Sequence, residues 1–110
     1  MKPVIYRIVQ KDKPDMFYIG STVNFSRRKS HHKKNVNNKK GKLYWTKLYT
    51  YIRTNGNWDN FEIHVIEDYD YKTYGEGLTA LKQREQYYID LFKPTLNAIK
   101  ACITNKYNDI

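Results

Sequence analysis

The side chain that most needs a chemical explanation is Glu85, a carboxylate on an otherwise apolar helix face. It lies four residues after Leu81 and four before Ile89, on the stripe that a helix over 78–92 should turn toward a core. Burying a carboxylate there costs on the order of several kcal/mol unless it is compensated. A divalent metal, an ion pair with Arg or a raised pKa would compensate it. A slight rotation of the helix that brings Glu85 to solvent is the alternative.

Arg28 and His32 form a second group with chemical potential. They are four residues apart, so they share one face of a predicted helix. A guanidinium can clamp a phosphate and stabilise the charge that grows on it, and a nearby His can bond a phosphate oxygen or carry a proton. The same spacing also fits a basic helix that faces solvent. Arg27 and His31 directly precede these two residues, so spacing alone does not decide which Arg and which His would act together.

Tyr6 and Tyr18 lie in two short runs, 4–9 and 16–20, whose residue types predict strands. If these strands form a regular hairpin, both hydroxyls emerge on one face of the sheet. A phenol beside a metal or a cation can lose its proton more easily and act as a base, or it can orient a water. Packing within the sheet is the alternative role for each. Gly20 is expected to end the second strand, where the backbone bends or approaches another group closely.

The remaining elements follow from hydrophobic spacing and from turn and capping residues. Asn24 suits the N-cap of a helix, and Asn55 with Gly56 suits the end of another. We predict, in chain order, a turn over 11–15, a helix from its cap at 24 to about 34, a helix over 43–53, a strand over 60–66, an irregular loop over 67–77 and a helix over 78–92. A small three-stranded antiparallel sheet flanked by helices is the economical mixed α/β (α+β) arrangement.

The composition favours an anionic partner. Twenty Lys and Arg against eleven Asp and Glu give a net charge of +9 over 110 residues, and nucleic acid is the commonest partner of such a chain. Charge concentrates in a stretch without any acid, where the candidate phosphate contacts are Arg27, Lys29, Lys33, Lys34, Lys39, Lys40 and Lys42. A solvated, flexible loop would look similar over part of this stretch.

Cysteine usage and hydropathy exclude several other classes of protein. The single cysteine, Cys102, excludes an internal disulfide and a Cys-rich zinc site. No apolar run approaches the length that crosses a membrane, and the N-terminus lacks a signal-peptide core. We therefore expect a soluble intracellular protein, in the cytoplasm or nucleus.

Two triplets add a family resemblance to this picture. Val4-Ile5-Tyr6 and Tyr18-Ile19-Gly20 resemble the pair that gives the GIY-YIG nuclease family its name, with Val4 in place of the family's first Gly. The family's later elements follow in the same order, as Arg28, His32, Glu85 and the ending Lys93-Pro94-Thr95-Leu96-Asn97. The resemblance implies that Arg28, and not Arg27, stands at the family's arginine position. Each element alone is weak evidence for the family, but five elements in the right order and at the right spacing are strong evidence.

The resemblance implies a metal-dependent DNA endonuclease that hydrolyses phosphodiester bonds with one divalent cation, Mg²⁺ or Mn²⁺. It implies that Tyr6 acts as general base or water-orienting group. It also implies that Tyr18 and Arg28 contact the phosphate and the nucleophile, and that Glu85 is the metal ligand. His32 stands at the family's histidine position.

Other functions are compatible with the same residues. A catalytically silent module could keep the basic face and bind nucleic acid, and an interaction protein could use the fold without nucleic acid. We expect residues 1–97 to form the nuclease-like domain and residues 98–110 a short polar tail. The basic surface, a partner protein or a homodimer would then supply substrate binding. Homing, repair and restriction roles all use this module, and a phage, a large virus or a mobile element would suit it.

Overall fold

A three-stranded antiparallel sheet forms the centre of the fold, as predicted. The computed structural model describes residues 2–97. The strands are β1 (Val4–Gln10), β2 (Lys13–Thr22) and β3 (Phe61–Asp68), and β1 lies in the middle. The helices are α1 (Phe25–Asn35), α2 (Lys47–Thr54), α3 (Tyr71–Tyr74) and α4 (Leu78–Phe92), with a short 3-10 turn, η1 (Trp58–Asn60), before β3. None of the helices within residues 2–97 is long and apolar enough to cross a membrane.

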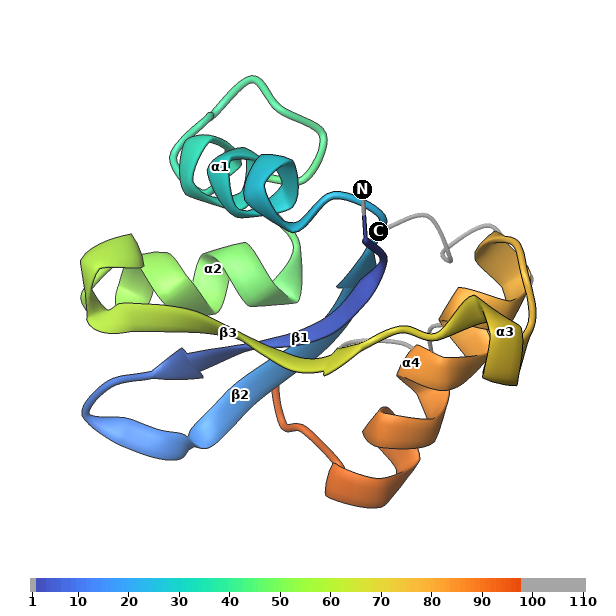
Figure 1. The fold of residues 1–110 in the computed structure, drawn as a ribbon. Helices are drawn as coiled ribbons and strands as arrows, with labels where there is room; N and C mark the ends of the chain where they lie inside the picture. Colours follow the sequence, from blue (N-terminus) through green and yellow to red (C-terminus); the bar gives the residue numbers. More distant parts are fainter. Residues whose placement is uncertain (1, 98–110) are drawn as a thin grey trace.

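Helices cover both faces of the sheet (Figure 1). α1 and α2 lie on one face, over a core that contains Tyr6 and Ile8 of β1. α4 lies on the other face, where Leu81 packs against Ile5 and Ile19. Because side chains alternate along a strand, neighbouring residues of β1 and β2 serve two separate cores. This alternation decides which functional side chains can meet directly.

The residues after α4 close the free edge of β2. Leu96 donates its backbone N–H to the carbonyl of Phe17 at 3.1 Å. The side chain of Asn97 then accepts from the N–H of Ile19 at 2.9 Å and donates to the carbonyl of Ile19 at 2.8 Å. The side-chain amide of Asn97 therefore makes the two hydrogen bonds that a residue of a neighbouring strand would make. It fixes the part of β2 that carries Tyr18.

The hairpin between β1 and β2 is tighter than the predicted turn over 11–15. β2 already begins at Lys13, so the turn is formed by residues 11 and 12. Pro14 is accommodated because β2 is an edge strand, where one missing N–H need not break a ladder. β2 also continues two residues past Gly20, to Thr22, so the prediction that Gly20 ends the strand was wrong.

Two further boundaries differ from the prediction. The helix predicted over 43–53 begins only at Lys47, because Thr46 caps it by accepting from the N–H of Tyr49. The segment predicted as an irregular loop over 67–77 contains the end of β3 and the short helix α3. Capping at Asn24 and a left-handed φ of 97° at Gly56 are confirmed.

An ion pair joins α4 to β3 near α3. Arg84 donates from Nε to Glu67 Oε1 at 2.7 Å and from Nη2 to Oε2 at 2.8 Å, which is a bidentate arrangement. The guanidinium also lies 4.0 Å from the centre of the Tyr74 ring. This contact packs Tyr74, the last residue of α3, against α4, while the side chain of Asp70 caps the start of α3 by accepting from the N–H of Lys72 at 3.0 Å.

Candidate active site

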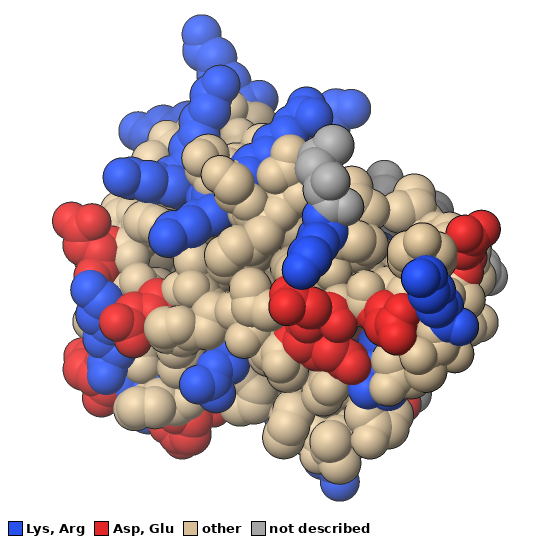
Figure 2. Space-filling model, viewed as in Figure 1, with Lys and Arg blue, Asp and Glu red and all other residues tan. Residues whose placement is uncertain are grey.

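The helix α1 has a basic outer face and a buried inner residue. Its outer face belongs to a patch of Lys and Arg, which Figure 2 shows at the top of the molecule, where Figure 1 places α1 and the loop after it. All seven predicted phosphate contacts are exposed, namely Arg27, Lys29, Lys33, Lys34, Lys39, Lys40 and Lys42. The predicted basic surface therefore exists as one region and is free of internal ion pairs among the described residues.

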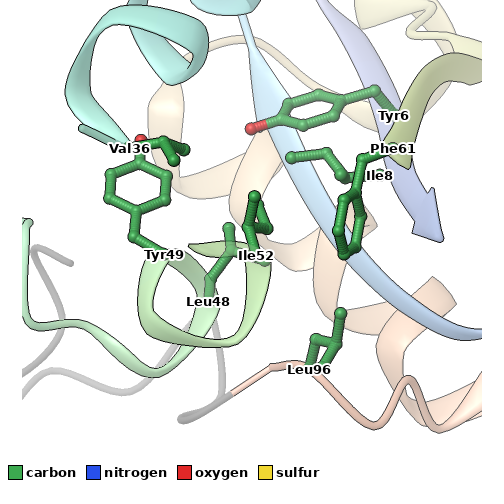
Figure 3. Close-up of a cluster of buried hydrophobic side chains, with 8 residues drawn as sticks. All are labelled: Tyr6, Ile8, Val36, Leu48, Tyr49, Ile52, Phe61 and Leu96. Carbon is green, nitrogen blue, oxygen red and sulfur yellow. The ribbon is translucent and has the colours of Figure 1, made fainter. Parts of the chain in front are cut away.

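His32 points the other way, into the core between α1 and the sheet. Only 5% of His32 is exposed. Its Nε2 lies 2.7 Å from the hydroxyl of Tyr6, and its Nδ1 lies 2.8 Å from the hydroxyl of Tyr49 on α2. Both hydroxyl ends point toward α1 (Figure 3). The ring of Trp58 stacks beside the imidazole at 6.2 Å, so His32 is enclosed by aromatic groups.

These surroundings keep His32 neutral. Burial, followed by the positive charge of Arg28, lowers the pKa of His32 from 6.5 to about 3. A neutral imidazole has one donor and one acceptor nitrogen. If Tyr6 donates its O–H to Nε2, then Nδ1 carries the proton and donates to the oxygen of Tyr49. Tyr6, His32 and Tyr49 thus form a continuous chain of hydrogen bonds.

Tyr6 and Tyr18 share one face of the sheet, as predicted. In the register of the hairpin, Tyr6 pairs with Gly20 and Ile8 pairs with Tyr18. The two tyrosine rings are 6.5 Å apart. Gly20 allows this arrangement, because a Cβ at that position would lie 2.6 Å from the hydroxyl oxygen of Tyr6. The close approach predicted at Gly20 is therefore confirmed and explains why a glycine occupies a strand interior.

The charge of Arg28 lowers the pKa of both tyrosines, in the direction predicted for a nearby cation, but burial outweighs this effect. Burial raises the pKa of Tyr6 well above 10.0, and the charge of Arg28 only opposes that rise. Burial likewise raises the pKa of Tyr18, and the charge of Glu85 adds to the effect. Both phenols are therefore protonated at neutral pH in the protein alone.

Glu85 is buried on the α4 side of the sheet, so the predicted placement on the inward stripe is confirmed. Only 4% of it is exposed. The hydroxyl of Ser21 donates to Oε1, and Nζ of Lys82 lies 3.4 Å from the same oxygen. Among the described residues, no donor bonds the second oxygen, Oε2. The alternative in which a rotated helix brings Glu85 to solvent is excluded, although Leu78 and Phe92 of the predicted stripe are themselves exposed.

The five predicted residues converge from three directions. Tyr6 and Tyr18 come from the sheet, and Arg28 and His32 come from α1. Glu85 approaches from the opposite face beside the edge strand β2, near enough for its charge to raise the pKa of both tyrosines. Among the described residues it does not bond directly to any of the other four, so its link to Tyr6 and Tyr18 is electrostatic.

Sequence reasoning missed two polar partners in this site. Ser21 directly follows the second triplet and lies two residues from Ile19, so alternation along β2 could have placed it on the face of α4. Tyr49 had no comparable signal, since it is one of eleven tyrosines and lies on a helix whose partners are distant in sequence.

A metal at this site would depend on Glu85. Within residues 2–97, no three His, Cys, Asp or Glu side chains gather as a metal-binding group. A single carboxylate with a free oxygen nevertheless fits Mg²⁺, which keeps several waters and is often bound through one or two carboxylates together with substrate phosphate. The donor set is therefore compatible with a hard divalent cation and incompatible with a closed structural site.

Comparisons with known proteins agree with this geometry. The profile of the GIY-YIG catalytic domain matches residues 2–100. The structure of a variant of the catalytic domain of the intron endonuclease I-TevI superposes with a TM-score of 0.73 at 22% identity, over 94% of this chain and 100% of that one. The catalytic domain of the homing endonuclease I-TevI superposes with a TM-score of 0.67 at 23% identity, over 87% and 94%. No curated protein sequence matches the chain at a significant level. Because the profile spans nearly the whole chain, the protein belongs to the GIY-YIG family of nucleases.

Proposed function

We propose that this nuclease is a metal-dependent DNA endonuclease whose site consists of Tyr6, Tyr18, Arg28, His32 and Glu85. The buried Glu85 carries the proposal. Glu85 is a buried carboxylate whose charge acts on two tyrosines; Ser21 and Lys82 contact one of its oxygens and leave the other without a donor among the described residues. A divalent cation held at that oxygen would offset the cost of burial, polarise a phosphoryl oxygen and stabilise the leaving oxygen.

Tyr6 activates the attacking water through a relay with His32. Because the pKa of Tyr6 is raised, no phenolate is available as a base at neutral pH. Tyr6 instead takes a proton from water while it passes its own proton to Nε2 of His32, 2.7 Å away. The resulting hydroxide attacks phosphorus, the bond to the leaving oxygen breaks with its electron pair, and that oxygen takes a proton from solvent. The negative phosphate favours the imidazolium only transiently, and His32 returns its proton to Tyr6, which releases one to solvent, so that the neutral pair is restored.

Arg28 binds the phosphate that is cut. It lies on the same helix as His32, its side chain is half-buried, and its charge acts on Tyr6, Tyr18 and His32. A guanidinium in this position can stabilise the charge on a phosphoryl group. The exposed lysines of α1 and of the loop after it would hold the flanking phosphates of DNA (Figure 2).

The proposed product is a nick. One chain has one such site within its described residues, so cutting both strands requires a homodimer, a partner protein or a second binding event. The two similar structures are catalytic domains of an intron or homing endonuclease. We propose a comparable mobile-element role for this chain.

The test is cleavage of supercoiled plasmid, first with Mg²⁺ or Mn²⁺ and then with EDTA. The unchanged protein should give nicked circles only with the metal. Glu85→Gln, which keeps the size of the side chain and removes its charge, should lose at least about 100-fold in rate, as should Arg28→Ala. Glu76→Gln is the matched control, because Glu76 is exposed and lies outside the site.

Two results would contradict the proposal in different ways. Nicking that persists in Glu85→Gln at an unchanged rate would remove the assigned metal ligand. A salt-sensitive gel shift without any cleavage, on several forms of DNA, would favour a catalytically silent binding module.

A further inference from the structure

Trp45 is unexpectedly exposed for a tryptophan. It lies in the loop 36–46 between α1 and α2, and 78% of it is exposed, more than any other large hydrophobic residue in the described chain. An isolated exposed leucine is ordinary, but tryptophan has a large apolar surface that most proteins cover. The proposed active site does not use this side chain.

The indole is held by a fixed support. The ring of Tyr44 meets it edge-to-face at 4.8 Å, and the guanidinium of Arg53 lies 3.5 Å from the centre of the Tyr44 ring and 5.8 Å from that of Trp45. Arg53 also donates to the carbonyl of Val36 at 2.6 Å and to that of Tyr44 at 2.7 Å. One arginine therefore ties both ends of the loop to α2, so presenting the indole to a partner costs little further ordering.

The charge around Trp45 identifies the chemistry of that partner. No Asp or Glu occurs between Asp15 and Asp59. The same interval contains ten basic residues, which are Arg27, Arg28, Lys29, Lys33, Lys34, Lys39, Lys40, Lys42, Lys47 and Arg53. An apolar protein surface docked on Trp45 would have to desolvate the guanidinium of Arg53, and with it charges of this basic region. DNA matches both features, because it offers phosphates to the lysines and flat base surfaces to an aromatic ring.

We propose that Trp45 contacts a nucleobase of bound DNA, either by stacking on an unpaired base or by wedging against a base step. This inference rests on the proposed DNA endonuclease function and extends it. The lysines bind phosphate without regard to sequence, whereas an indole between bases favours steps or structures that unstack easily. Trp45 would therefore bias which DNA is cut, and Arg53 is its positioning residue.

The test uses the full chain in EDTA, so that DNA is bound without being cut. Duplexes of one sequence, with and without a single unpaired base, are titrated at several salt concentrations. Trp45→Ala should weaken binding by at least about fivefold, and the loss should be larger on the duplex with the unpaired base. The slope of log affinity against log salt should not change. The matched variant Lys40→Gln should instead lower that slope by about one and weaken both duplexes similarly.

Indole fluorescence gives a second readout that needs no loss of affinity. Binding should quench the emission of the unchanged protein, and Trp45→Phe should remove most of the quenching while it retains binding. The comparison isolates Trp45 from Trp58, which lies against His32. Leu78→Ala is the control for an exposed apolar residue outside the basic region, and it should leave affinity unchanged.

The outcomes separate this inference from the proposed function. DNA bound with full affinity by Trp45→Ala, or bound without quenching that depends on Trp45, would overturn the role of Trp45 and leave the endonuclease proposal standing. The exposed indole would then belong to a protein contact. Failure of the unchanged chain to bind or nick any DNA would overturn both.

Discussion

Lowering the pH from 7 to 5 should destabilise the fold through His32. The pKa of His32 is about 3 in the folded chain and 6.5 as its ordinary value, so the unfolded chain binds a proton first as the pH falls. A group with a lowered folded pKa stabilises the fold above its unfolded pKa and loses that contribution below it. At about 1.4 kcal/mol per pH unit, the 1.5 units between 6.5 and 5 amount to a loss of about 2 kcal/mol.

The assay is urea unfolding at pH 7 and at pH 5, for the unchanged protein and for His32→Gln. The variant is less stable at both pH values, but it lacks the titrating group, so its stability should fall by about 2 kcal/mol less. His31 and His64 are exposed and contribute equally to both proteins. The lowered pKa of Glu67, which comes first from its hydrogen bonds with Arg84, acts below its ordinary value of 4.5 and so outside the window.

Equal losses of stability in the two proteins would refute the reasoning. So would NMR signals of the His32 ring that titrate near pH 6.5, because they would show an imidazole in contact with solvent. Either result would also weaken the proposed relay, which needs a neutral His32 to receive the proton of Tyr6.

Two further substitutions test how the site is positioned. Gly20→Ala places a Cβ 2.6 Å from the hydroxyl of Tyr6, so plasmid nicking should fall about 100-fold. Gly41→Ala, whose Cβ meets the side chain of Asn38 at 3.0 Å and its carbonyl oxygen at 3.2 Å, lies away from the site and should nick normally. An active Gly20→Ala protein would show that Tyr6 tolerates displacement. Asn97→Ala removes both side-chain hydrogen bonds to Ile19 and should lower the free energy of unfolding by about 1–3 kcal/mol in urea. Asn37→Ala, which also loses two side-chain hydrogen bonds but at an exposed pair with Asn57, should change it by less than about 0.5 kcal/mol, and equal effects would contradict a special role for Asn97.

The parts of the fold that depend on local chemistry were predictable from the sequence. α4 has the predicted bounds, and Asn24 and Gly56 act at the predicted helix ends. The predicted boundaries were wrong where contacts between distant parts of the chain determine the local structure. The bidentate pair between Arg84 and Glu67 joins α4 to the end of β3 inside the segment predicted as a loop, and Pro14 can occupy β2 because that strand forms an edge. Neither partner can be identified from its own neighbours in sequence.

The candidate site was likewise predictable where it depends on local patterns and unpredictable where it depends on packing between elements. Alternation along two paired strands predicts that Tyr6 and Tyr18 share a face, and helical spacing predicts that Glu85 is turned inward. Neither pattern shows that Glu85 reaches the tyrosines from the opposite face of the sheet, since this depends on α4 packing beside β2. The distinction matters for mechanism. A carboxylate on the same face could bond the tyrosines directly, whereas here Ser21 and Lys82 contact one oxygen of Glu85, and the proposed cation would bind the other.

The raised pKa of Tyr6 leads to a related conclusion about His32. A tyrosine beside Arg28 would be expected from sequence to lose its proton easily, but burial outweighs that charge. The proposed mechanism therefore needs a proton acceptor, and the neutral imidazole of His32, 2.7 Å from the hydroxyl of Tyr6, is the candidate that the fold provides. Tyr49 completes the arrangement, because its bond to Nδ1 fixes the ring and leaves Nε2 facing Tyr6. A residue with no signal in the sequence thus determines which nitrogen of His32 can take part in the reaction.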